Sequence, residues 1–151
     1  MRILSINASE DEIKRVLVEW TERMAQEQYA EALELIPYDA LHLYENNEWT
    51  PELLESVVRG YGLAGLTKEE VLQEFGCLYK ITSLDDMADR EKILDSIEIN
   101  YDFSWFKGND IAEIWYDVPL NGVQSDLTGR FLLRKTDEQH MMLIFEDLHV
   151  M

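Results

Sequence analysis

The sequence has few of the features that would place a protein in a membrane or in an oxidising compartment. It contains a single cysteine, Cys77, so no disulfide can form within the chain and no disulfide-supporting compartment is required. No apolar run approaches the ~20 residues that a membrane-spanning helix needs. The segment 1–7 becomes polar too early for a secretory signal. We therefore expect a soluble, cytoplasmic protein without a membrane partner.

Basic residues are also scarce. The chain has 13 lysines and arginines against 31 aspartates and glutamates, which gives a formal net charge of −18. A chain with this charge is repelled by a phosphate backbone, so we expect no nucleic-acid partner. The same field steers a basic protein towards the chain and speeds their association.

The length of 151 residues and the hydrophobic fraction of 46% predict one folded domain over 1–151 with a substantial core. Capping signals at Ser9, at Thr50-Pro51 and at Thr67 mark helix starts in the first half, 9–95. Ile13, Val16, Leu17, Trp20 and Met24 share one face of the first helix. A break near 26–28 separates this helix from the next. Residues 77–95 remain ambiguous.

From Ile97 onwards the hydrophobic period changes to two, which indicates strands in the second half, 96–151. Strands are expected over 97–105, 111–120, 123–135 and 140–150, with Asn121-Gly122 as a hairpin turn. The sequence therefore predicts an α+β fold in which helices pack on one face of a curved, four-stranded antiparallel meander.

The chain end carries a resemblance to a known group of proteins. Ser125-Asp126-Leu127-Thr128 and the final Glu146-Asp147-Leu148-His149-Val150 resemble an uncharacterised family of small bacterial domains. Members carry an S-D-L-T strand and end on a D-[DE]-[IL]-H-V-like strand, and a pair like Tyr61-Gly62 follows a middle helix. The order of elements also looks like the NTF2-like superfold, a curved sheet that wraps helices into a cone. That superfold includes enzymes, ligand binders and immunity proteins, so the resemblance implies a fold and no particular activity.

A candidate pocket emerges if the strand pairing follows two-residue turns. Glu146 then points to the apolar face opposite Gly129, and Tyr101, Tyr116 and Trp105 complete the lining. A buried carboxylate with a raised pKa is how such cones build a general base. The competing interpretation is a β-bulge at Glu146-Asp147 that turns the acid out to solvent. We expect the bulge.

A candidate interface appears on the opposite face, where apolar side chains are unexpected. The same register gathers Phe106, Ile111, Leu132, Leu143 and Phe145 near the hairpin end of that face. Such a cluster suggests a covered surface. We expect a homodimer to cover it, with a helix from 77–95 as the alternative within one chain.

The same register also predicts an acidic row on that opposite face. Asp117 opposite Asp126, next to His149, is compatible with a hard cation, with histidine as the counter-ion, or with a solvated acidic surface. We expect no metal, no cofactor and no catalytic residue, because no metal, nucleotide or nucleophile motif is present. Cys77 follows Gly76 at a helix end, where nothing would activate a thiol.

These features favour a non-catalytic, acidic protein-interaction module for a basic protein partner, by analogy with toxin immunity proteins. The alternative is an NTF2-like small-ligand-binding protein or pocket enzyme that uses a buried carboxylate. A sealed core favours the first, and an open cone with an inward Glu146 favours the second.

Overall fold

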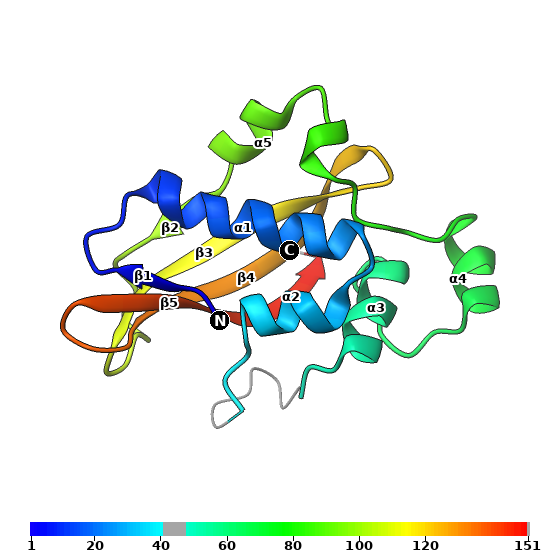
Figure 1. The fold of residues 1–151 in the computed structure, drawn as a ribbon. Coiled ribbons are helices and arrows are strands. Elements are labelled where there is room, and N and C mark those ends of the chain that lie inside the picture. The colour runs from blue at the N-terminus through cyan, green and yellow to red at the C-terminus, as the bar shows by residue number, and fades with distance from the viewer. Residues whose placement is uncertain (41–47, 151) are drawn as a thin grey trace.

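The computed structural model describes residues 1–40 and 48–150, and it has the expected α+β architecture (Figure 1). In these residues a five-stranded antiparallel sheet has the order β1-β5-β4-β3-β2. The strands are β1 (Ile3–Ser5), β2 (Glu98–Asn100), β3 (Asp110–Leu120), β4 (Val123–Lys135) and β5 (His140–Val150). The helices are α1 (Glu10–Ala25), α2 (Tyr29–Leu35), α3 (Pro51–Arg59), α4 (Lys68–Phe75) and α5 (Arg90–Asp95), with a 3-10 turn, η2 (Leu84–Asp86).

The helix starts are confirmed at the predicted capping residues. The Ser9 hydroxyl accepts the backbone N–H of Glu12 at the start of α1, and Thr67 forms a reciprocal capping box with Glu70 at the start of α4. The break between α1 and α2 lies at Glu27, whose φ of 59° is left-handed and ends the helix.

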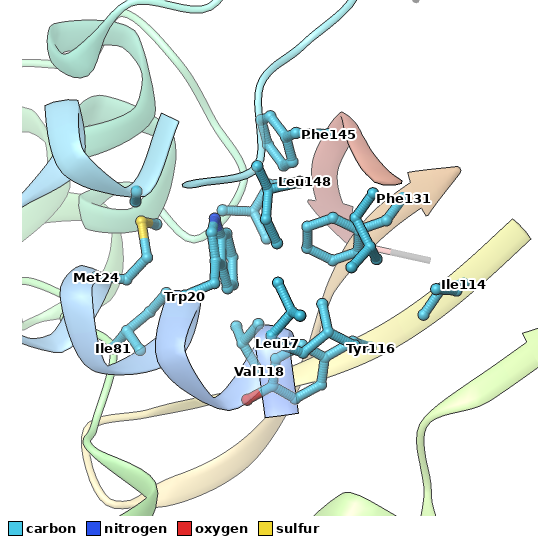
Figure 2. Close-up of a cluster of buried hydrophobic side chains, with 14 of the residues drawn as sticks. Leu17, Trp20, Met24, Ile81, Ile114, Tyr116, Val118, Phe131, Phe145 and Leu148 are labelled. Atoms are coloured by element: carbon cyan, nitrogen blue, oxygen red, sulfur yellow. The ribbon is translucent and has the colours of Figure 1, made fainter. Parts of the chain in front are cut away.

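The core lies between α1 and one face of the sheet, which we call the inner face. Figure 2 shows Leu17 and Trp20 of α1 pointing towards Tyr116 and Phe131 of the sheet. The Trp20 ring meets Phe131 edge-on, with 5.2 Å between ring centroids. The side chain of Thr21 donates to the carbonyl of Leu17 and lies 2.7 Å from the Tyr116 hydroxyl, so a buried polar pair joins α1 to β3.

The central hairpin is confirmed, but the strand count is wrong. Asn121 and Gly122 have φ values of 48° and 83°, as a tight turn between β3 and β4 requires. The sheet has five strands because Ile3–Ser5 pairs antiparallel with β5. A strand of three residues is too short to show a hydrophobic period, so the pattern did not predict it.

The first predicted strand, 97–105, is mostly a loop. Only Glu98–Asn100 pairs with β3, and the chain then leaves the sheet. Phe103 stacks on Trp105 with 4.1 Å between ring centroids, and the Trp105 indole donates to Glu113 on the face opposite the helices. Contacts between side chains, and not a backbone ladder, therefore hold this segment over what we call the outer face.

A β-bulge in β5 decides which side chains face the core. Arg130 pairs with Asp147 and Phe131 pairs with Phe145, which leaves Glu146 as the extra residue. The insertion shifts the alternation by one, so Leu143 and Phe145 point to the inner face and are buried. The predicted interface needed both side chains on the opposite face, which only uninterrupted pairing after the last turn would give.

Candidate functional site

A pocket of about 670 Å³ opens on the outer face and reaches the β5 edge of the sheet. Its floor is the cross-strand pair Leu132 and Ile144. The chain after α2 contributes one wall and the 101–109 loop the other. The lining residues are Tyr38, Asp39, Trp49, Trp105, Lys107, Gly108, Asn109, Asp110, Leu132, Arg134, Ile144, Phe145 and Glu146.

The bulge is fixed in place by the segments that flank α2 and α3. The indole N–H of Trp49 donates to the backbone carbonyl of Glu146 at 3.1 Å, and the Phe145 N–H donates to the carbonyl of Pro37 at 2.8 Å. The Trp49 ring also packs edge-on against Phe145. The backbone groups of the bulge that face away from β4 therefore have partners, and the Glu146 side chain lines the pocket.

The side chain of Glu146 is mostly buried, and the pKa of its carboxyl group is raised. The expected bulge is confirmed, but the expected turn to solvent is wrong, because the side chain is only 15% exposed. Burial, helped by the negative charge of Glu113, raises its pKa from 4.5 to about 7, although Arg130 and Arg134 act in the opposite direction. Glu146 therefore changes its charge near neutral pH.

Glu113 is the buried centre of the polar network beside the pocket. Its carboxylate accepts the indole N–H groups of Trp105 and Trp115 at 3.1 and 2.6 Å, and the Arg130 guanidinium at 2.6 and 3.0 Å. A buried carboxylate is tolerated only with such partners. Neither Glu113 nor Arg130 was predicted as a site residue, although their alternation with core residues places them together on the outer face.

Arg134 forms a second ion-pair group at the other end of the pocket. It donates to Asp39 at 2.6 Å and to Asp110 at 2.9 Å. This arginine therefore joins β4 to β3 and to the segment after α2. Sequence reasoning missed it, because the pairing with Asp39 spans 95 residues and leaves no local pattern.

The structure separates the five residues of the predicted pocket. Tyr116 and Gly129 lie on the inner face within the core, and Tyr101 is exposed on the loop after β2. Only Glu146 and Trp105 share the observed pocket. The space above Gly129 does not hold a carboxylate, because the Phe131 ring fills it and would come within 2.9 Å of an added Cβ.

The predicted interface does not form one patch either. Leu143 and Phe145 are core residues, and Ile111 packs against the core from the strand end. Leu132 is in the pocket floor, and Phe106 meets the Phe103 ring edge-on with 5.6 Å between centroids. The homodimer was inferred from that patch, so the inference loses its basis.

The acidic row has a different pairing from the one expected. Asp117 lies opposite Thr128 and accepts its hydroxyl at 2.6 Å, while Asp126 accepts the hydroxyl of Tyr61. Asp117 and Asp126 are therefore not direct neighbours. Within residues 1–40 and 48–150, no group of three acidic, histidine or cysteine side chains is arranged to hold a metal ion.

Comparison of the chain with protein-family models, with curated proteins and with solved structures gave no match. In the described part of the chain, no helix has both the length and the apolar character needed to cross a membrane.

Proposed function

We propose that this protein is a non-catalytic binding module for a basic protein, which docks on the outer face around the pocket. The observation that carries the proposal is how the charged groups around the pocket are paired. The arginines Arg130 and Arg134 are already held by carboxylates, whereas the closest ion-pair contact of the Glu146 carboxylate, with Arg130, is 3.9 Å long.

The charge of the whole chain acts in the same direction. A net charge of −18 attracts a basic surface over a distance and opposes an acidic one. This proposal also agrees with the resemblance to the NTF2-like superfold, which includes immunity proteins. By analogy with those proteins, the basic partner is a toxin.

A second candidate function uses the same pocket for chemistry on a small ligand. The observation in its favour is the Glu146 pKa of about 7, which suits a general base at neutral pH. None of the described lining residues is a serine, threonine, cysteine or histidine, so Glu146 would have to act without a neighbouring nucleophile of these types. We therefore favour the binding function.

The test is affinity capture of partners from the cells that encode the chain, followed by titration with the purified partner. We expect a basic protein that wild type and the control variant Glu74→Arg retain at low salt. High salt and Glu146→Arg should both release it. Circular dichroism would establish that each variant is folded. An acidic partner, or equal retention by Glu146→Arg, would contradict the proposal.

A further inference from the structure

The pocket contains a carboxylate, Glu146, whose ion pair with Arg130 is long, at 3.9 Å. Arg134 is shared between Asp39 and Asp110, and Arg130 donates two hydrogen bonds to Glu113. An anionic ligand would have to compete with those carboxylates for the guanidinium groups. A cationic ligand at Glu146 competes with the longer, 3.9 Å contact to Arg130.

The pocket also has an aromatic wall that is held rigidly. Phe103 covers one face of the Trp105 ring at a centroid distance of 4.1 Å, and Glu113 fixes the indole nitrogen. Trp105 nevertheless keeps 53% of its surface exposed and lines the pocket. An exposed indole face attracts cations, and a guanidinium group can stack on it.

The floor of the pocket suits the aliphatic part of a long side chain. Leu132 and Ile144 lie side by side on the outer face between Trp105 and the chain after α2. Long basic side chains commonly lay their methylene groups on such apolar surface and keep the charged end on polar groups. The volume of about 670 Å³ accommodates one such side chain with neighbouring backbone.

The geometry points to a binding site for a single arginine side chain, whose guanidinium stacks on Trp105 and forms an ion pair with Glu146 over the Leu132–Ile144 floor. This inference depends on the proposed function, because it assigns the arginine to the basic partner. Arginine fits better than lysine since its planar group can stack on the ring and bind a carboxylate through two N–H groups.

Binding at this site is coupled to a proton. The charged groups facing Glu146 from the surrounding elements are Glu113 and Asp110 of β3, Arg130 and Arg134 of β4, Asp39 after α2 and Lys107 of the loop. With a pKa near 7, the ionised fraction of Glu146 rises from about a tenth at about pH 6 to about nine tenths at about pH 8. An arginine therefore binds about tenfold more tightly at the higher pH and displaces the proton.

The experiment titrates the full chain with N-acetyl-arginine methylamide as the probe. Binding is monitored by two-dimensional NMR at about pH 6 and at about pH 8. The uncharged isostere N-acetyl-citrulline methylamide and the lysine analogue are the comparisons. We expect the arginine probe to shift the Trp105 indole and Glu146 amide signals, with about tenfold tighter binding at about pH 8 than at about pH 6. The citrulline probe should not bind, and the lysine probe should bind more weakly.

The test variant is Glu146→Gln. Its matched control is Glu74→Gln, because Glu74 is exposed on α4. We expect Glu146→Gln to weaken binding and remove its pH dependence, and Glu74→Gln to change neither. Equal binding of citrulline, tighter binding at the lower pH, or no shift at any probe concentration would overturn the inference.

The inference and the proposed function can fail separately. If the arginine probe fails while Glu146→Arg still releases a basic partner, the arginine site is wrong and the binding function stands. If the probe binds as expected but no basic partner is captured, the site stands and the proposed function is wrong.

Discussion

The indole N–H of Trp49 donates to the backbone carbonyl of Glu146, a residue 97 positions later in the chain. This bond connects the start of α3 to the bulge of β5. It satisfies a carbonyl of the bulge and holds the Glu146 side chain at the pocket. The position of the acid, and with it the raised pKa, therefore depends on a tryptophan from a distant element.

Trp49→Phe tests that dependence, because phenylalanine keeps a ring against Phe145 but cannot donate. We expect a loss of about 1 kcal/mol in the free energy of unfolding, the usual net value of one hydrogen bond. We also expect the Glu146 pKa to fall towards its ordinary value as the bulge loosens. Urea unfolding and carboxyl-carbon NMR would measure the two effects. An unchanged Glu146 titration would show that the bulge is held without Trp49.

Glu146→Gln should change how stability depends on pH. The pKa of Glu146 is raised from 4.5 to about 7, so the folded state keeps the proton longer than the unfolded state. Wild type therefore loses stability as the pH rises through this window, by up to about 3 kcal/mol for a shift of this size. Glutamine carries no charge, so the variant avoids the loss and gains on wild type as the pH rises.

Urea unfolding at several pH values between about 4.5 and about 8 would measure this difference. Glu74→Gln on α4 is the matched control, and it should follow wild type throughout. A constant difference between Glu146→Gln and wild type over the whole range would contradict the raised pKa.

Glu113→Gln should lower the pKa of Glu146. The Glu113 charge is the second contribution to the raised value, after burial, and its removal also leaves Arg130 with less competition for its positive charge. The same substitution weakens a buried ion pair and should reduce the free energy of unfolding by about 3 kcal/mol. NMR titration of Glu146 in the folded variant separates the two effects. An unchanged or higher pKa would show that burial alone accounts for the shift.

Thr21→Val and Tyr116→Phe should have unequal effects on stability. The Thr21 hydroxyl donates to the Leu17 carbonyl, so Tyr116 must donate to Thr21 across their 2.7 Å contact. Thr21→Val leaves the buried Tyr116 hydroxyl without an acceptor and should cost about 1–3 kcal/mol. Tyr116→Phe leaves Thr21 bonded to Leu17 and should cost about 1 kcal/mol or less. Thermal unfolding compares the two, and the reverse order would contradict this hydrogen-bond direction.

Gly129→Ala should destabilise the core, because an added Cβ would lie 2.9 Å from the Phe131 ring. That ring is buried against Trp20 and Phe145 and has little freedom to move. Overpacking of this kind costs about 1–3 kcal/mol. In a Phe131→Leu background the same substitution should cost less, since the obstructing ring is gone. Equal costs in both backgrounds would assign the effect to the backbone.

Local sequence signals predicted the elements that depend on local interactions. Ser9 and Thr67 start their helices because each bonds to an N–H three residues later, and Asn121-Gly122 forms a turn because both residues accept positive φ. These interactions are complete within a few residues. The α+β class followed from the change in hydrophobic period at Ile97.

The bulge at Glu146 decides which side chains of β5 face the core and where the acid lies. No short segment of the sequence determines this bulge. Phe145 beside an acid indicated a bulge, but the residues that hold the bulge are Pro37 and Trp49, far away in the chain. A one-residue insertion exchanges the two faces for 140–145, so the predicted interface is wrong. Glu146 and Trp105 share a pocket, but it lies on the outer face and not on the predicted inner face. The 101–109 segment alternates like a strand, yet its indole contact with Glu113 takes it off the ladder.

The contacts of Pro37 and Trp49 also affect how this protein can assemble with others. β1 covers only the first part of β5, from His140 to Met142, and exposed strand edges elsewhere in proteins recruit further strands. At Phe145 and Glu146 the outward backbone groups are already bonded to Pro37 and Trp49. A second chain cannot add a strand there without first displacing the segments around α2 and α3. The same bonds that hold the acid in place therefore protect this edge of the sheet against cross-β aggregation.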